Sequence, residues 1–157
     1  MNRKGCGFSR RLRLSGAAAT EALGARIAAG LAAGDAVALQ GDLGAGKTTL
    51  ARAILGALGV AGVVPSPTFT LVQCYETDKF PVRHYDLYRI ERAEELEELG
   101  LGEALEEGAA LIEWPERARM ADDALHVRLT IAEGDARMAE ISGPPHWAKI
   151  FESADAQ

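Results

Sequence analysis

The sequence predicts a single-domain α/β fold, and three observations lead to this prediction. The chain has 157 residues, which suits one domain, and its 48% hydrophobic and 25% charged residues are typical of a globular protein. Short apolar runs alternate with longer segments of helical periodicity. Near the end, residues 125–131 and 137–141 alternate in polarity on either side of Glu133-Gly134-Asp135, which predicts a C-terminal β-hairpin.

The first half of the chain predicts two strands, each followed by a helix. Residues 10–14 alternate as a short strand does, and residues 17–33 are rich in alanine with leucine and isoleucine about four positions apart. Residues 36–40 (AVALQ) form an apolar run that is typical of a buried strand. Residues 47–58 predict a helix that ends at Gly59.

The second half predicts more strands and an acidic helical segment. Residues 68–75 are β-branched and aromatic, and residues 82–88 form another candidate strand. Residues 91–107 contain eight glutamates and predict one or two short helices with a solvated acidic face or, alternatively, a partner surface. Residues 109–112 (AALI) predict a buried strand, and residues 147–151 a helical turn.

These elements define one folded domain with short extensions. We expect residues 11–151 to form the domain. The basic residues 1–10 are expected to be a flexible extension, and residues 152–157 a flexible tail.

Charge and cysteine content exclude several classes of protein. The net charge is −6 although the first 13 residues contain five basic residues, and an acidic body argues against a nucleic-acid clamp. Cys6 and Cys74 make no CxxC motif and no disulfide framework, so we expect a reducing, cytoplasmic location. No apolar run is long enough to span a membrane, so we expect no membrane association.

One motif carries chemistry directly. The string GDLGAGKT at residues 41–48 fits the pattern GxxxxGK[ST], with a predicted strand before it and a predicted helix after it. Glycines allow the loop to curl so that its backbone N–H groups face phosphate oxygens, and the following helix presents its positive end to the same phosphates. In this pattern Lys47 contacts the β- and γ-phosphates, and the hydroxyl of Thr48 binds Mg²⁺.

Two carboxylates follow apolar strands. Asp86 and Glu113 stand where residues 82–85 and 109–112 end, and the carboxyl ends of strands in an open α/β sheet face the ligand crevice. Nucleotide turnover needs a carboxylate for Mg²⁺ and a group that positions water, so both are candidates. Ser66 and Thr68 flank Pro67 in a loop that can sense phosphate or Mg²⁺, although a proline-stiffened turn explains the same residues.

Other residue patterns favour structural roles. The three histidines, His84, His126 and His146, show no metal-ligand spacing, and His84 is interpreted as an alternating strand residue. Trp114 and Trp147 are interpreted as packing residues rather than as platforms for a base.

Four blocks together resemble a known family. GDLGAGKTT (41–49), PSPTFTLV (65–72), HYDLYRI (84–90) and LIEWPE (111–116) occur in the order and spacing of the bacterial TsaE (YjeE) ATPases. The resemblance implies a compact P-loop NTPase domain with a mixed sheet and no lid domain. It implies binding of ATP and Mg²⁺ and slow, partner-stimulated hydrolysis that supports the threonylcarbamoyladenosine (t6A) modification of tRNA. The expected partners are TsaB and TsaD, which carry out the transfer, so contact with tRNA is mainly indirect.

The resemblance also implies a set of site residues. Asp86 and Lys47 are the expected catalytic residues, with Asp86 positioning water, and Thr48 and Glu113 are the expected Mg²⁺ ligands. The expected nucleotide-binding residues are Gly41, Asp42, Leu43, Gly44, Ala45, Gly46, Lys47, Thr48, Thr49, Ser66 and Thr68.

One position departs from the family pattern. Family members often have Gly-Arg in the C-terminal hairpin, where the arginine can approach the nucleotide. This chain has Gly134-Asp135, and the nearest arginine is Arg137. Either Arg137 replaces the family arginine after a small register shift, or that contact is absent.

Two alternative functions stay open at this point. A small-molecule P-loop kinase would need an acceptor pocket and a lid arginine, for which Arg117 and Arg119 are candidates. A nucleotide-dependent scaffold would bind Mg²⁺ through Asp86 and Glu113 with little turnover.

Overall fold

A computed structural model of the chain describes residues 7–62, 64, 67, 70–118 and 123–155. The described part contains one mixed seven-stranded sheet with the strand order β2-β8-β7-β3-β6-β5-β4. The strands are β2 (Phe8–Leu14), β3 (Ala36–Gln40), β4 (Val72–Tyr75), β5 (Val82–Asp86), β6 (Ala109–Glu113), β7 (Leu125–Ile131) and β8 (Arg137–Gly143). The expected α/β fold with a C-terminal hairpin is confirmed.

The centre of the sheet is parallel and its edges are antiparallel. Strand β3 pairs in parallel with β6 and β7, and β5 pairs in parallel with β6. Strands β2 and β7 both pair antiparallel with β8, and β4 pairs antiparallel with β5. Because β3, β5 and β6 run the same way, Gln40, Asp86 and Glu113 end at the same edge of the sheet.

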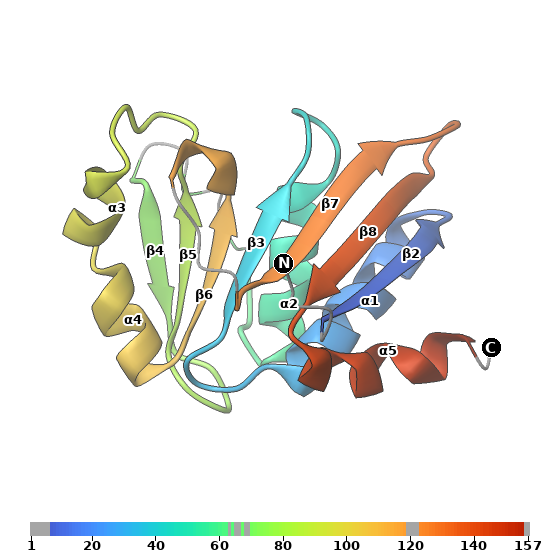
Figure 1. Ribbon diagram of the computed structural model, residues 1–157, viewed down its shortest axis with the longest axis horizontal. Helices are drawn as coiled ribbons and strands as arrows, with labels where there is room; N and C mark the ends of the chain where they lie inside the picture. The colour runs from blue at the N-terminus through green and yellow to red at the C-terminus, as the bar shows by residue number, and fades with distance from the viewer. Residues whose placement is uncertain (1–6, 63, 65–66, 68–69, 119–122, 156–157) are drawn as a thin grey trace.

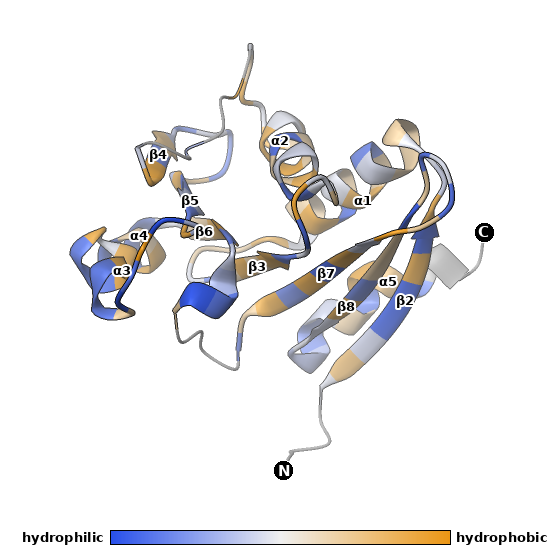
Figure 2. Cartoon of the chain, turned by 90° about the horizontal axis from the view of Figure 1, so that it is seen from above, coloured by the Kyte–Doolittle hydropathy of each residue, from blue (hydrophilic) through white to orange (hydrophobic). Residues whose placement is uncertain are grey.

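Helices cover both faces of the sheet (Figure 1), and Figure 2 shows α1 and α2 on the side opposite α3 and α4. The helices are α1 (Ala17–Gly30), α2 (Lys47–Ala57), α3 (Glu94–Glu98), α4 (Leu101–Glu107) and α5 (Ala148–Asp155), with short 3-10 turns at Pro115–Arg117 and Pro145–Trp147. The larger core packs α1 and α2 against residues such as Val37, Leu111 and Val127. The smaller core packs Leu96 against Tyr85 and Ile112.

Alternation along the strands decides which face each side chain occupies. On β5, Val82 belongs to the larger core and Tyr85 to the smaller one, so His84 and Asp86 share the α2 side with Val82. Strands β2, β7 and β8 show the alternation as bands of hydrophilic and hydrophobic residues (Figure 2).

The two ends of the expected domain extend further than the sequence indicated. Strand β2 begins at Phe8, inside the segment expected to be flexible, because residues 8–14 pair with β8 and the ring of Phe8 stacks on Phe151 at 5.6 Å. Helix α5 continues to Asp155, inside the expected tail. Residues 1–6, 156 and 157 lie outside the described residues.

Three other elements are shorter than expected. Helix α1 ends at Gly30 because Leu31 is extended and the side chain of Asp35 accepts a hydrogen bond from the Ala32 N–H at 2.8 Å. Strand β4 begins only at Val72, after Leu71 at φ +70°. Strand β5 ends at Asp86, whose carboxylate accepts a hydrogen bond from the Tyr88 N–H at 3.0 Å and turns the chain.

Among the described residues, none of the helices combines the length and the hydropathy that a transmembrane span requires.

Candidate nucleotide-binding site

The glycine-rich loop at residues 41–46 joins the carboxyl end of β3 to the amino end of α2, as the sequence predicts. Gly46 precedes the helix at φ +107°, a conformation that strains residues with a Cβ atom. Gly41 lies so close to strand β7 that an added Cβ would stand 2.6 Å from the carbonyl oxygen of Leu129. Glycine is therefore required at both ends of the loop, for two different reasons.

Arg137 on β8 holds this loop from outside. Its Nε donates a hydrogen bond to the carbonyl of Ala45, and its Nη2 donates one to the carbonyl of Gly44, both at 3.2 Å. The guanidinium thus contacts the loop backbone directly. These contacts direct the carbonyls of Gly44 and Ala45 toward the hairpin.

Lys47 is buried at the start of α2, with 4% of its surface exposed. Its ammonium group donates hydrogen bonds to the carbonyls of Gly41 and Asp42 and lies 4.0 Å from the centroid of the Trp114 ring. Burial lowers the pKa of Lys47 below its ordinary value of 10.5, and nearby carboxylates, Glu113 first among them, offset this only in part. The loop carbonyls and the Trp114 ring therefore surround the Lys47 cation.

Three residues from three elements meet beside Lys47. The Thr48 hydroxyl lies 2.9 Å from Oε1 and 3.1 Å from Oε2 of Glu113, which ends β6. His84 Nε2 on β5 lies 2.6 Å from the same Oε2. His84, Asp86 and Glu113 are 0%, 4% and 2% exposed, so the polar cluster is withdrawn from bulk water.

Asp86 lies next to this cluster because the sheet register pairs it with Glu113. Both carboxylates line a cavity of about 320 Å³ that is also lined by Leu43, Gly44, Gly46, Lys47, Thr48, Thr49 and Trp114. The phosphate loop and the two strand-end carboxylates therefore face one space, as their sequence positions predict.

The donor set suits magnesium. A threonine hydroxyl and a carboxylate are the hard oxygen ligands that Mg²⁺ takes, and Mg²⁺ commonly uses one or two carboxylates together with substrate phosphates. Within the described part of the chain, no group of three or more His, Cys, Asp or Glu side chains gathers as a metal site. Thr48 and Glu113 thus fit a Mg²⁺ ion whose other ligands come from nucleotide and water.

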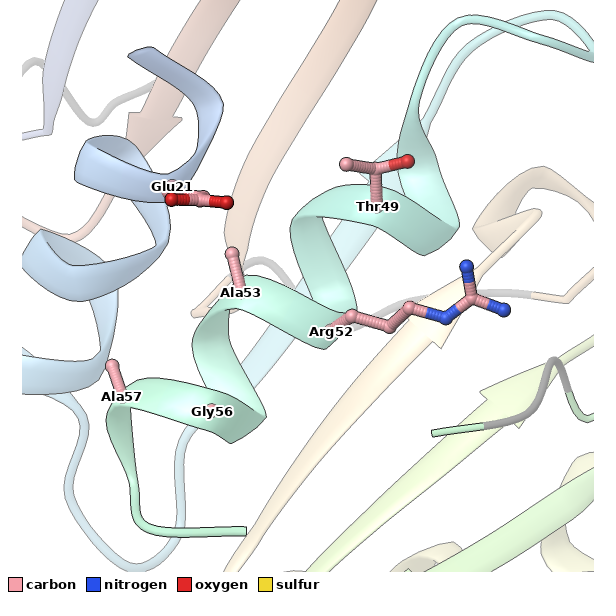
Figure 3. Close-up of a pocket in the computed structure, with 6 residues that line it drawn as sticks. All are labelled: Glu21, Thr49, Arg52, Ala53, Gly56 and Ala57. Atoms are coloured by element: carbon pink, nitrogen blue, oxygen red, sulfur yellow. The ribbon is translucent and has the colours of Figure 1, made fainter. Parts of the chain in front are cut away.

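Further cavities lie near the loop or near α2. One of about 240 Å³ lies between the β2–α1 junction, the hairpin and the loop, and its lining includes Leu14, Ala17, Thr20, Gly46, Thr49 and Arg137. A larger one, about 510 Å³, is lined by Glu21 of α1 and by residues of α2, among them Thr49 (Figure 3). In Figure 3 Glu21 of α1 faces Ala53, whereas Arg52 points away from α1. This larger cavity contains neither a loop glycine nor a strand-end carboxylate, so its size does not identify the site.

Some expected site residues cannot be placed, and others were missed. Ser66 and Thr68 lie outside the described residues. The sequence interpretation of His84 as an ordinary strand residue is incomplete, because the sheet brings it to Glu113. Trp114 is more than a packing residue, since its ring covers Lys47 and lies 4.9 Å from the ring of Tyr88. The usable signal for His84 was its two-residue spacing from Asp86.

Comparison with known proteins agrees with this geometry. The family model described as "Threonylcarbamoyl adenosine biosynthesis protein TsaE" matches residues 14–139. The chain belongs to the TsaE family. The resemblance seen in the four sequence blocks is therefore confirmed.

Curated TsaE relatives match most of the chain. The tRNA threonylcarbamoyladenosine biosynthesis protein TsaE of Rickettsia prowazekii is 43% identical over 110 residues, which cover 68% of this chain and 76% of the relative. The protein of the same name from Streptomyces coelicolor is 42% identical over 118 residues, covering 72% and 80%. The crystal structure of YdiB from Bacillus subtilis superposes with a TM-score of 0.75 at 27% identity over 96% of each chain.

Proposed function

We propose that the protein is a Mg²⁺-dependent ATPase that supports the t6A modification of tRNA by binding and resetting a TsaB–TsaD complex, without itself transferring the threonylcarbamoyl group. The observation that carries the proposal is the contact of Thr48, at the start of the phosphate loop helix, with Glu113 at 2.9 Å. This contact brings a hydroxyl and a carboxylate together beside the loop lysine. Family membership supports the pathway.

The loop residues bind the triphosphate. Backbone N–H groups of residues 41–46 and the amino end of α2 receive the phosphate oxygens. Lys47 exchanges the carbonyls of Gly41 and Asp42 for the β- and γ-phosphates. Burial lowers the pKa of Lys47 because it disfavours the charged form, and a nearby phosphate anion would favour that charged form.

Thr48 and Glu113 hold the metal ion. Mg²⁺, when bound there, neutralises negative charge on the phosphates. The Thr48 oxygen keeps its lone pairs for the ion while its hydrogen is donated to Glu113. The buried Glu113 carboxylate is thereby oriented before the substrate arrives.

Asp86 positions the attacking water. Its carboxylate lies in the same cavity as Lys47 and Glu113, and one oxygen, Oδ1, accepts a hydrogen bond from the Tyr88 N–H at 3.0 Å. That bond fixes the rotation of the carboxylate. Asp86 can then accept a hydrogen bond from water aligned with the terminal phosphate.

The nucleoside occupies the 240 Å³ cavity beside the loop. Gly46 and Thr49 line this cavity, so it adjoins the loop that is proposed to hold the phosphates. Its lining combines apolar Leu14 and Ala17 with the polar side chains of Thr20 and Arg137, which suits a base and a ribose.

The test measures ATP hydrolysis with and without purified TsaB and TsaD, at fixed salt and with no other acceptor. We expect slow turnover alone and strong stimulation by the pair. Asp86→Asn in the assembled complex should abolish the stimulated rate while ATP binding persists. Tight ATP binding without stimulation would contradict the proposal and favour a scaffold or a kinase.

The kinase alternative depends on lid arginines. Arg117 lies over the ring of Tyr88, with its Cζ atom 5.3 Å from the centroid. Arg119 lies outside the described residues. Release of ADP without any acceptor, in the presence of the partners, separates the ATPase from the kinase.

A further inference from the structure

His84 is a buried histidine that the proposed reaction does not use directly. It lies on β5 with 0% of its surface exposed, on the same side of the sheet as Asp86 and Val82. Its Nε2 atom lies 2.6 Å from Oε2 of Glu113. Its Nδ1 atom has no hydrogen-bond partner among the described residues.

The direction of this hydrogen bond follows from the chemistry of the two groups. A carboxylate that binds Mg²⁺ is deprotonated and can only accept, so in the proposed metal site His84 donates from Nε2 to Glu113. A hydrogen bond of 2.6 Å to a charged acceptor is at the strong end of the range. Nδ1 has no partner in the described part of the chain, so the polar contact that the structure shows for the His84 ring is the one with Glu113.

The hydrogen bond with His84 gives the two carboxylate oxygens of Glu113 different partners. Oε2 receives His84 at 2.6 Å, whereas the Thr48 hydroxyl approaches Oε1 more closely, at 2.9 Å against 3.1 Å for Oε2. Thr48 has one hydroxyl hydrogen and can donate it to only one oxygen at a time. His84 therefore fixes the rotation of the carboxylate so that Oε1 faces Thr48.

We propose that His84 is a positioning residue for the magnesium site: by donating Nε2–H to Oε2 of Glu113, it presents Oε1 to Thr48 and to the metal ion. The inference rests on the proposed function, because it assigns a role toward Mg²⁺ to a residue behind the expected ligands. Groups that orient metal ligands change metal affinity by about 10- to 100-fold when they are removed.

A purely structural role for His84 makes a different prediction. A buried hydrogen bond that only stabilises the fold would, when lost, lower the melting temperature and leave the folded fraction with unchanged Mg²⁺ dependence. A positioning role predicts weaker Mg²⁺ binding in protein that is fully folded. The apparent Mg²⁺ affinity of the nucleotide complex therefore distinguishes the two roles.

The experiment measures ADP binding to the full chain by calorimetry over a Mg²⁺ titration, with the folded state verified by circular dichroism. Glutamine places its amide nitrogen close to the position of His Nε2, whereas asparagine is one methylene shorter. We expect His84→Asn to weaken the apparent Mg²⁺ affinity by about 10-fold or more, and His84→Gln to restore most of it. In both variants, ADP affinity without Mg²⁺ should stay at the wild-type value.

Val82→Ala is the matched control. Val82 is fully buried on the same strand and the same side of the sheet, and its side chain has no polar atom. It should lower stability without changing the Mg²⁺ dependence. Equal Mg²⁺ affinity in His84→Asn, His84→Gln and Val82→Ala would overturn the inference, as would a parallel loss of ADP affinity with and without Mg²⁺.

The wild type separates this inference from the proposed function. If Mg²⁺ does not strengthen nucleotide binding by the wild-type protein, the proposed Mg²⁺-dependent ATPase is wrong. If Mg²⁺ strengthens it equally in the wild type and both His84 variants, only the role of His84 is wrong.

Discussion

The guanidinium of Arg137 donates a hydrogen bond to the carbonyl oxygen of Ala45, a residue 92 positions earlier in the chain. A second hydrogen bond reaches the carbonyl of Gly44. The C-terminal hairpin thereby fixes the backbone of a loop that belongs to the first half of the sequence. Arg137 thus links the backbone of the glycine-rich loop to the packing of the hairpin.

Arg137→Met should therefore weaken nucleotide binding by about tenfold, equivalent to about 1.4 kcal/mol, because the loop loses two anchors before phosphate arrives. Calorimetry with ADP measures the change. Arg11→Met is the control, because it replaces an exposed arginine on β2. In the described sheet β2 pairs with β8, the strand that carries Arg137. Equal affinities in the two variants would show that Arg137 does not organise the loop.

Gly46→Ala should damage binding and stability together. Gly46 has φ +107°, and holding a residue with a Cβ atom in such a conformation costs about 1–3 kcal/mol. The loop is expected to relax away from the geometry that surrounds the phosphates, so ADP affinity falls. Urea denaturation and ADP titration measure the two effects. Gly56→Ala is the control, because Gly56 lies inside α2 with open space around its Cα atom and no positive φ.

Thr48→Val should remove the gain in nucleotide affinity that Mg²⁺ gives, but not nucleotide binding itself. Valine keeps the shape of threonine but has no hydroxyl to contact Glu113. We expect ADP affinity without Mg²⁺ to be retained and the gain from Mg²⁺ to fall by about tenfold or more, equivalent to about 1.4 kcal/mol. Thr48→Ser, which keeps the hydroxyl, should behave like the wild type. A normal gain from Mg²⁺ in the valine variant would rule out Thr48 as a ligand.

Trp114 should report nucleotide binding by fluorescence. Its ring lies 4.0 Å from the Lys47 ammonium, which in the proposed function moves toward phosphate when nucleotide binds. Trp147 is 1% exposed in the larger core and should not respond. ADP is therefore expected to change the emission of the wild type, and Trp114→Phe should abolish the change while ADP affinity measured by calorimetry persists. An unchanged fluorescence response to ADP in Trp114→Phe would show that the signal comes from another residue.

Glu95 should make stability depend on pH at the start of α3. Its carboxylate accepts hydrogen bonds from the backbone N–H groups of Glu91 and Arg92, at 2.9 and 2.8 Å, and these bonds lower its pKa below the ordinary 4.5. A carboxyl group with a lowered pKa in the folded state stabilises the fold above its ordinary pKa. The contribution is lost as pH falls through the lowered value.

The test compares melting temperatures of the wild type and Glu95→Gln at neutral and acidic pH. The wild type should be the more stable protein above pH 4.5, and the two should converge as the pH falls below the lowered pKa. Glu103→Gln is the control, because it replaces a glutamate in the first turn of the neighbouring helix α4 and leaves the contacts of Glu95 in place. If the difference in melting temperature between the wild type and Glu95→Gln stays constant with pH, Glu95 does not cause the pH dependence.

Local patterns predicted the parts of the fold whose signals are short in sequence. Strand β3 has the bounds expected from its apolar run, and the hairpin strands begin where the alternation begins. The ends of α1 and β5 and the start of β4 were mispredicted. Hydrogen bonds to the carboxylates of Asp35 and Asp86 end the first two, and the positive φ of Leu71 delays the third. The periodic pattern of apolar residues continues past these boundaries in the sequence, so the pattern alone does not locate them.

The sequence alone determined the phosphate loop, the two strand-end carboxylates and the family resemblance, because these depend on residue types at short, fixed spacings. Only the tertiary structure decided that His84 contacts Glu113, that Arg137 holds the loop and that Trp114 covers Lys47. Each of these contacts joins elements that are distant in the chain, and sheet register and hairpin position bring them together. Spacing in one strand indicates the face on which a side chain lies, whereas its partner is set by the neighbouring strand.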